Sequence, residues 1–479
     1  MPARTGAEFL RGLRDNREVW LGAEKITDPA EHPALRGAAH ALAATFDLQH
    51  VAAEVCLMPD PETGESIAVS HMIPHSRDDL IRRRGALRKV AEYTVGLMGR
   101  TPDYMNVTFA GFAGREDEWA INGNEQGAAN LVAYQKRMAR GDLSLTHTLI
   151  HATVDKSKGN TPTGLDETQL HKVEDTANGI LVRGARVLAT LAPFSDEIAV
   201  YPSAPMPNAD HRHALTFSIP MDTPGLKFIC RDSVSTSSNN FDNPLSNRFD
   251  EQDAFVIFDN VEIPRDRVFI DGNLAVYNSV MSPSWRANAM HQTMVRAWTK
   301  LEFAWGTASR MAEAINASDP VTNQMLGEIW SYAELTRAAV FAGEQGAHEY
   351  GNGAWFLDER PMQALRGILP IWFPRVNEII RLIGSHNVLA TPTSSQLADP
   401  YLRPLIDKYL RGAGDVTAEA RARIFRLGWD FAGSALGSRN EQYERFYLTS
   451  SARNLQAAQM RMDRTEAYRL VDRFLQEPV

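Results

Sequence analysis

The hydrophobic pattern of this chain changes twice, and the order of its three parts limits the possible folds more than any other feature. Up to about residue 145, apolar residues recur near a 3.6-residue period, as in 78–98, which predicts helices. From about 146 to 275 the apolar runs are short and β-rich, as in 254–258, which predicts strands. After about residue 285 the helical spacing returns over longer stretches such as 295–312.

This order predicts an α+β multi-domain protein. A chain of 479 residues exceeds the size at which a single hydrophobic core stops growing, so several domains are expected. We expect an N-terminal helical domain over 1–145, a compact β-barrel or sandwich over 146–278, and a C-terminal helical bundle over 279–479. Two prolines, at 370 and 374, are expected to interrupt the bundle helix predicted over 360–383.

Charge and cysteine content exclude several classes of protein. A net charge of −9 and the lack of an extended basic block argue against a nucleic-acid partner. Cys56 and Cys230 are too few for an iron–sulfur cluster or a disulfide scaffold, which indicates a reducing compartment. No secretory h-region is visible, and no run of about 18 apolar residues predicts a membrane span. We therefore expect a cytoplasmic protein without a membrane partner.

Two short segments carry residues suited to acid–base chemistry on a polar substrate. Segment 99–104 holds Arg100 and Tyr104, and segment 145–151 holds His147. A cation, a phenol and an imidazole are the groups that such chemistry needs. The structural alternative for Arg100 depends on Pro102. Pro102 is expected to end a preceding helix, and in this alternative the guanidinium simply caps the helix C-terminus and offsets its dipole.

Other patterns leave structural alternatives open. His147 and His151 have the H-x-x-x-H spacing of a helical zinc pair, but Thr148 stands where the motif needs a general base, so no metal is expected. The chain has no G-x-S-x-G, G-x-G-x-x-G or Walker A motif, so no Rossmann fold or P-loop would hold a nucleotide cofactor. Thr190 at a predicted strand end and Ser203 in a proline-bounded turn each suit a purely local role.

Matches to one family run almost from end to end in the same order. The matching segments are 4–10, 99–104, 145–147, 188–193, 222–227, 249–251, 256–259, 432–435 and 443–446. Through them the chain resembles the oxygenase components of the 4-hydroxyphenylacetate 3-monooxygenase family, which are two-component, FADH2-dependent phenol hydroxylases. The resemblance implies an acyl-CoA-dehydrogenase-like fold with an N-terminal helical domain, a central β-barrel and a C-terminal four-helix bundle. It also implies a homotetramer packed through that bundle.

The resemblance implies a reaction as well as a fold. A separate flavin reductase would supply FADH2, and O2 would react through a C4a-hydroperoxyflavin to hydroxylate a small phenolic substrate ortho to its hydroxyl. Arg100, Tyr104 and His147 would be the catalytic residues and, with Ser203, would bind the substrate. The polar loop 235–240 suggests a phenol with a polar or larger tail.

The resemblance also assigns residues to the flavin, and this chain departs from the family pattern at some of them. The implied flavin-binding residues are His147, His151, Thr153, Asp155, Lys156, Ser157, Thr190, Thr449, Ser450 and Ser451. His151-Ala152-Thr153 replaces the Asn-Pro-Gln typical of the family, and 449–452 replaces a Gly-Asp-Pro. These departures leave the local mode of flavin contact open.

Two other functions share the implied fold. An acyl-CoA-dehydrogenase-type flavoenzyme would need a catalytic carboxylate in the bundle, and 384–386 and 436–439 offer no obvious one. A related 4-hydroxybutyryl-CoA dehydratase would need more cysteines than the chain has. A non-catalytic flavin-binding homologue is the remaining alternative, and the joint presence of Arg100, Tyr104 and His147 argues against it.

Overall fold

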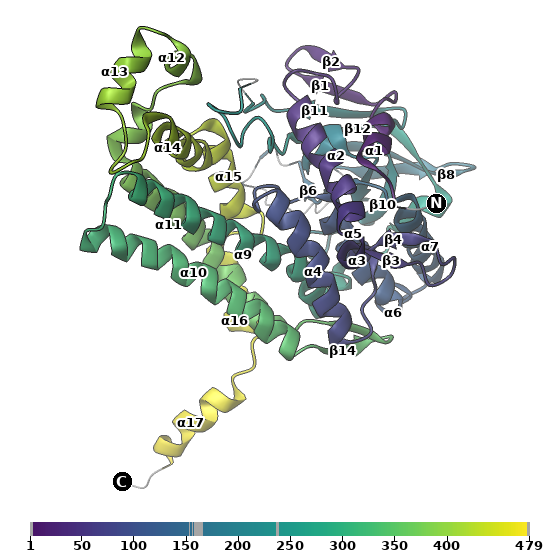
Figure 1. Cartoon of the computed structure of the whole chain (residues 1–479). Helices are drawn as coiled ribbons and strands as arrows, with labels where there is room; N and C mark the ends of the chain where they lie inside the picture. Colours follow the sequence, from purple (N-terminus) through teal and green to yellow (C-terminus); the bar gives the residue numbers. More distant parts are fainter. Residues whose placement is uncertain (1–2, 153, 156, 158–165, 236–238, 477–479) are drawn as a thin grey trace.

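A computed structural model describes residues 3–152, 154–155, 157, 166–235 and 239–476 of the chain (Figure 1). The N-terminal part is mainly helical, as the sequence predicts. Its longer helices are α2 (Arg36–Val51), α4 (Arg77–Tyr93), α5 (Pro102–Gly114) and α7 (Glu125–Gly141), and its short ones are α1 (Gly6–Gly12), α3 (Ala53–Cys56) and α6 (Glu116–Trp119). Every residue of α5 is buried, so this helix forms the centre of the N-terminal part.

The segment before α5 differs from the sequence-based expectation. Helix α4 already ends at Tyr93, and Pro102 is the first residue of α5 rather than the end of an earlier helix. Proline suits a first helical position because the helix needs no N–H there. The interpretation of Arg100 as a C-terminal cap is therefore wrong, and Arg100 lies just before a helix N-terminus.

The described strands of the central part form two sheets. The larger contains β1 (Glu18–Leu21), β2 (Glu24–Ile26), β6 (Ile150–His151), β7 (His171–Asp175), β8 (Gly179–Thr190), β11 (Leu226–Cys230) and β12 (Asp253–Pro264). The smaller has the strand order β13 (Val268–Asp271), β10 (Leu215–Pro220), β9 (Glu197–Val200) and β5 (Leu145–Thr148). Phe217 and Phe258 meet edge to face at 5.9 Å between the sheets, so the apolar faces form a shared core.

The larger sheet also recruits strands from the start of the chain. β1 pairs in parallel with β11, and β2 pairs with β1 at the sheet edge. Asn178 and Gly179 lie at the hairpin between β7 and β8, and Asn-Gly is a favoured sequence for such a turn. Two small hairpins, β3–β4 (Leu57–Pro59, Ser66–Ala68) and β14–β15 (His348–Gly351, Ala354–Phe356), lie outside the sheets. Because the N-terminal segment joins the β region, the domain bounds proposed above stay predictions.

The C-terminal part is built around long helices. They are α9 (Pro283–Ala314), α10 (Pro320–Gln345), α11 (Glu359–Leu389) and α14 (Ala418–Ala432), accompanied by α8 (Leu274–Ser279), α12 (Ser394–Ala398), α13 (Leu402–Tyr409), α15 (Ala435–Phe446), α16 (Ser451–Arg461) and α17 (Thr465–Leu475). Figure 1 shows α17 extending away from the body. Pro370 and Pro374 lie inside α11 without ending it, contrary to the expectation, and the backbone departs from helical geometry at Ser385 instead.

Within the described ranges, no helix combines the length and the apolarity that a membrane span requires.

Candidate active site

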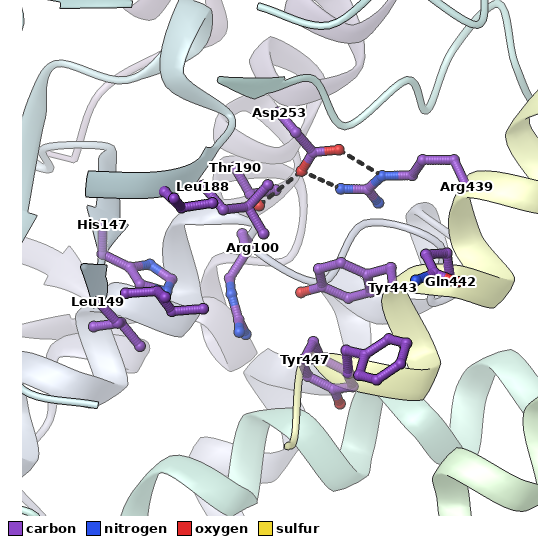
Figure 2. Close-up of a pocket in the computed structure, with 13 residues that line it drawn as sticks. Arg100, His147, Leu149, Leu188, Thr190, Asp253, Arg439, Gln442, Tyr443 and Tyr447 are labelled. Carbon is purple, nitrogen blue, oxygen red and sulfur yellow. Dashed lines mark hydrogen bonds and ion pairs between the residues drawn. The ribbon is translucent and has the colours of Figure 1, made fainter. Parts of the chain in front are cut away.

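A cavity of about 410 Å³ lies between strand β8 and helix α15, and we call it the main cavity (Figure 2). Its walls are mostly apolar. Arg100, His147, Thr190, Asp253, Arg439, Gln442, Tyr443 and Tyr447 provide its polar or aromatic groups, and Leu149, Ile150, Val187, Leu188 and Phe446 provide its apolar ones. A predominantly apolar pocket with a few converging polar groups is the usual form of a small-molecule site.

Of the three residues that the sequence singles out, Arg100 and His147 line this cavity, and Tyr104 contacts both of them. The Arg100 guanidinium lies 4.0 Å from the centre of the Tyr104 ring, and the Tyr104 and His147 rings stack at 5.3 Å. Arg100 also faces the rings of Tyr447 at 5.1 Å and Tyr443 at 5.8 Å. The N-terminus of α5 therefore positions Arg100 and Tyr104, β5 positions His147, and α15 closes the group from the opposite side.

Burial gives the two basic groups different protonation states. Burial and the nearby Arg100 charge lower the pKa of His147 well below its ordinary range, so its imidazole is neutral. Burial opposes the charge of Arg100, but the surrounding tyrosine oxygens raise the pKa of Arg100 above its ordinary range. The site therefore pairs a neutral base with a permanent cation.

Several polar atoms at the main cavity have no hydrogen-bond partner among the described residues. They are Nη1 of Arg100, Nδ1 of His147 and the hydroxyl oxygen of Tyr443, and all three are buried. Unpartnered buried polar atoms are costly, so native structures rarely keep them without a ligand or water. Their position at a cavity indicates that a polar ligand completes these hydrogen bonds.

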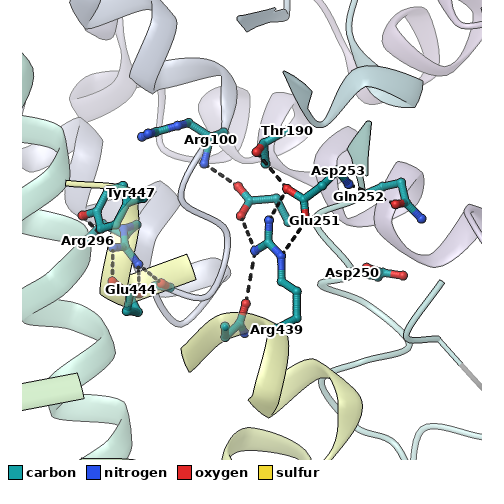
Figure 3. A network of polar contacts seen from close by, with 12 residues as sticks. Arg100, Thr190, Asp250, Glu251, Gln252, Asp253, Arg296, Arg439, Glu444 and Tyr447 are labelled. Carbon is teal, nitrogen blue, oxygen red and sulfur yellow. Dashed lines mark hydrogen bonds and ion pairs between the residues drawn. The ribbon is translucent and has the colours of Figure 1, made fainter. Parts of the chain in front are cut away.

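A charged network next to the main cavity holds Thr190 and the backbone of Arg100 (Figure 3). Thr190 Oγ1 donates to Asp253 Oδ1 at 2.8 Å, and Arg439 binds Asp253 through two nitrogens at 2.6 and 2.8 Å. Arg439 also contacts Glu251 at 2.9 Å, and Glu251 accepts from the Arg100 backbone N–H. Burial alone would raise the pKa of Asp253, but Arg439 and Arg231 lower it, so Asp253 is ionised.

Sequence reasoning assigned no role to this network or to Tyr443 and Tyr447. The available signals were the acidic run 250–253 just before a predicted strand and the family match at 443–446. Neither signal says which basic residue neutralises the acids, because Arg439 lies 186 residues away from Asp253.

A second cavity of about 410 Å³ lies next to the first and shares Ile150 with it. Three residues predicted for substrate or flavin line this second cavity: His151, Ser203 and Thr449. His147 and His151 lie on separate short strands rather than on one helix, so they do not have the geometry of a helical zinc pair. No group of three or more His, Cys, Asp or Glu residues in the described ranges is arranged to hold a metal ion.

The other predicted flavin residues lie elsewhere. The Ser451 hydroxyl donates to the Gly367 carbonyl at 2.6 Å, and Ser450 caps α16 by accepting from the Arg453 N–H. Asp155 accepts two hydrogen bonds from Ser157 in an exposed turn. Thr153 and Lys156 lie outside the described residues. Their roles as flavin ligands stay predictions.

The residues of the main cavity fit an isoalloxazine ring. A planar heteroaromatic system needs flat apolar walls and donors at its polar edge, and Leu188, Tyr443 and Phe446 provide such walls. The unpartnered Arg100 nitrogen provides a donor, and the Thr190 hydroxyl, which gives its proton to Asp253, provides an acceptor. The groups present are therefore compatible with bound FAD.

Comparison with known proteins gives one consistent family. Models described as 4-hydroxyphenylacetate 3-hydroxylase N terminal and C terminal match residues 5–270 and 280–476. The 4-hydroxyphenylacetate 3-monooxygenase oxygenase component of Thermus thermophilus is 35% identical and covers 95% of this chain and 93% of its own. A Streptomyces globisporus monooxygenase named for a peptidyl-carrier-protein-bound 3-amino-3-(3-chloro-4-hydroxyphenyl)propanoyl substrate is 32% identical, with 92% and 84% coverage.

Solved structures agree with the sequence matches. The oxygenase component HpaB of 4-hydroxyphenylacetate 3-monooxygenase, complexed with FAD and 4-hydroxyphenylacetate, superimposes with a TM-score of 0.94 at 33% identity. The superposition covers 99% of this chain and 98% of HpaB. An archaeal 4-hydroxybutyryl-CoA dehydratase from N. maritimus has a TM-score of 0.86 at 20% identity, which supports the shared fold alone. The chain therefore belongs to the 4-hydroxyphenylacetate 3-hydroxylase family of flavin-dependent aromatic monooxygenases.

Proposed function

We propose that this protein hydroxylates a phenol ortho to its hydroxyl group, using O2 and FADH2 that a separate flavin reductase supplies. One oxygen atom enters the ring and the other leaves as water. The observation that carries this proposal is that Arg100 and His147 line one cavity and contact Tyr104, and that each keeps a buried nitrogen without a partner among the described residues. The same observation favours an enzyme over a non-catalytic flavin-binding homologue.

His147 and Arg100 would act together on the substrate hydroxyl. The His147 pKa is lowered enough to keep its imidazole neutral, so it can accept a hydrogen bond from the phenol hydroxyl. The negative charge that this hydrogen bond builds on the phenol oxygen is stabilised by the adjacent guanidinium, and it makes the ring a stronger nucleophile. Tyr104, stacked on His147, would hold the substrate ring in line for oxygen transfer.

The residues around the main cavity would hold the flavin. When bound, reduced FAD supplies the two electrons that activate O2. Thr190 would face the flavin ring, with its hydroxyl oriented by Asp253. The apolar side chains of Leu188 and Phe446 would contact the flavin ring. His147, His151 and Thr449 would contribute further flavin contacts, and the same role is proposed for Thr153, Asp155, Lys156, Ser157, Ser450 and Ser451.

Incubation of the pure protein with chemically reduced FAD, O2 and a panel of phenols tests the proposal. We expect a catechol product that carries one oxygen atom from labelled O2. The first phenol to test is 4-hydroxyphenylacetate, because the relatives are named for its hydroxylation. Hydrogen peroxide as the sole product with every phenol would contradict the proposed function. Bovine serum albumin in place of the protein controls for free flavin chemistry.

A homotetramer is proposed on separate grounds. Large apolar side chains are exposed on the bundle surface, including Trp330 and Leu335 of α10 and Leu382 of α11. Helix α17 exposes Val471 and Phe474. Exposed apolar surface of this extent is typical of an interface between subunits. A cytoplasmic location stays a prediction of the sequence.

A further inference from the structure

The second cavity is lined by more positive charge than its neighbourhood neutralises. Arg286 of α9, Arg366 of α11, and Arg453 and Arg461 of α16 all line it, and we call it the arginine chamber. None of its lining residues in the described part of the chain is an aspartate or a glutamate. Arg453 and Arg461 are exposed to solvent, whereas Arg286 and Arg366 are half-buried, so an anion in the cavity would stabilise these two most.

The ion pairs of the described residues do not remove this imbalance. Arg286 contacts Glu359 at 3.3 Å, and it is the only one of the four arginines with a carboxylate at ion-pair distance in the described chain. Arg366 donates from Nε to the Leu448 carbonyl at 3.1 Å, which satisfies one N–H group but supplies no charge. Burial lowers the pKa of Arg286 and Arg366, and their neighbouring arginines lower it further.

Two buried donors add a second, independent observation. The indole nitrogen of Trp285 and the amide nitrogen of Gln363 line the arginine chamber and have no hydrogen-bond partner among the described residues. Trp285 is 9% exposed and Gln363 is 8% exposed, so bulk water does not readily satisfy them. An indole N–H and an amide NH2 can only donate, as can a guanidinium. The unsatisfied groups therefore call for a ligand rich in acceptors.

The arginine chamber is continuous in its lining with the main cavity. Ile150 lines both, and Ser203, expected beside the substrate tail, lies in the arginine chamber. Arg366 also lies near Tyr104, because the Tyr104 hydroxyl raises the pKa of Arg366 through its charge. A ligand with its phenol beside Arg100 and His147 can therefore extend its tail past Ile150 toward the arginines.

We propose that the arginine chamber binds an anionic group, a carboxylate or a phosphate, at the end of the phenolic substrate's tail. Arg366 and Arg286 are then specificity-determining residues, with Trp285 and Gln363 as further donors to the same group. This inference rests on the proposed function, because it names the substrate class of that site. Guanidinium groups suit both anions, since their paired N–H donors match two oxygens at once.

The test compares an anionic phenol with an uncharged one of similar size. In Arg366→Gln we expect the KM for 4-hydroxyphenylacetate to rise by about tenfold or more, because the variant loses one charge-assisted hydrogen bond to the carboxylate. The KM for its uncharged methyl ester should change less than twofold. Arg366→Lys should recover part of the affinity for the acid. Arg381→Gln is the control, because Arg381 is on the same helix but outside both cavities.

Three results would overturn the inference. An equal rise of KM for the acid and the ester would indicate a general distortion of the site. Weaker binding of FAD with unchanged binding of riboflavin in Arg366→Gln would assign the chamber to the flavin phosphates instead. Equal thermal stabilisation of wild type and Arg366→Gln by phenylacetate, which lacks the phenol, would show that the arginine does not bind the anion. The phenylacetate measurement needs no turnover, so it separates failure of this inference from failure of the proposed function.

Discussion

At the scale of single residues, burial rather than residue type sets the properties of the site. His147 would titrate near neutral pH in water, but its pKa is lowered far enough here that it stays neutral at physiological pH. Arg100 keeps its charge in the same buried setting because aromatic rings and phenol oxygens surround it. A phenol entering between them meets an acceptor and a cation together.

Replacement of His147 by alanine should uncouple flavin oxidation from hydroxylation. Without the acceptor the phenol stays protonated, so we expect the rate of catechol formation to fall by about 100-fold or more. Hydrogen peroxide should account for the missing oxygen, as measured by product and peroxide yield per FADH2 consumed. His348→Ala, which changes an exposed histidine, is the control. Normal coupling in His147→Ala would rule out the proposed role.

Asp103 gives a prediction about stability. Burial raises the pKa of Asp103 to about 7 from an ordinary 3.8. The folded protein therefore holds a proton that the unfolded chain releases between about pH 4 and 7, and stability falls as pH rises through this window. Between pH 5 and pH 7.5, Asp103 should lower the free energy of unfolding by about 2–3 kcal/mol.

In Asp103→Asn the side chain cannot ionise, so this part of the pH dependence should disappear. The free energy of unfolding of wild type and variant is measured at pH 5 and pH 7.5 by urea unfolding followed by tryptophan fluorescence. Asp222→Asn, at an exposed aspartate, should leave the wild-type pH dependence in place. Identical pH dependence in Asp103→Asn and wild type would contradict the assigned protonation.

At the scale of elements, the turn between α4 and α5 decides where Arg100 lies. This turn packs directly against α15, since a Cβ atom placed on Gly99 would lie 2.8 Å from ring atoms of Tyr443. The same helix supplies Arg439 to the Asp253 network and Glu444, which Arg296 and Lys300 of α9 neutralise at 2.8 Å (Figure 3). Helix α15 thus links the bundle to the β region and the N-terminal part.

Gly99→Ala should therefore displace Tyr443 from the wall of the main cavity. We expect weaker FAD binding, by about tenfold, and a lower melting temperature, because overpacking of a close contact costs about 1–3 kcal/mol. Fluorescence titration with FAD and differential scanning calorimetry measure the two effects. The matched control is Gly306→Ala in α9, where a Cβ meets no atom within 4 Å and helix propensity favours alanine. Wild-type FAD affinity in Gly99→Ala would contradict the assigned contact.

At the scale of the whole molecule, apolar side chains are exposed on the bundle and on the projecting α17, and this supports the proposed tetramer. Val471 and Phe474 of α17 are 53% and 62% exposed although α17 has an amphipathic pattern. Figure 1 shows this helix away from the rest of the chain, so a second copy is the natural source of a covering surface.

The double variant Val471→Glu/Phe474→Glu should shift the protein toward a smaller assembly. Two charges on the apolar face of α17 would oppose its burial between subunits. Light scattering coupled to size-exclusion chromatography should give the mass of four chains for wild type and a lower mass for the variant. Arg469→Glu, also on α17, serves as a control for charge change. A wild-type protein that elutes as a monomer would contradict the tetramer proposal.

The sequence by itself determined the element types, the α–β–α order and the trio Arg100, Tyr104 and His147. These are local properties, since periodicity reports the helix or strand and a short motif reports its own residues. Pro102 shows where local rules fail. A proline is compatible with the end of one helix and with the start of the next, and only the packing of α5 selected the start.

Only the tertiary structure decided which distant charges meet. Asp253 and Arg439 pair across 186 residues, and the arginine chamber takes its cations from α9, α11 and α16. No local pattern specifies such encounters, because they depend on how the whole chain buries its apolar faces. The sequence therefore supplies the residues of the proposed phenol site, whereas the neighbouring network and the arginine chamber appear only once the helices and sheets are packed together.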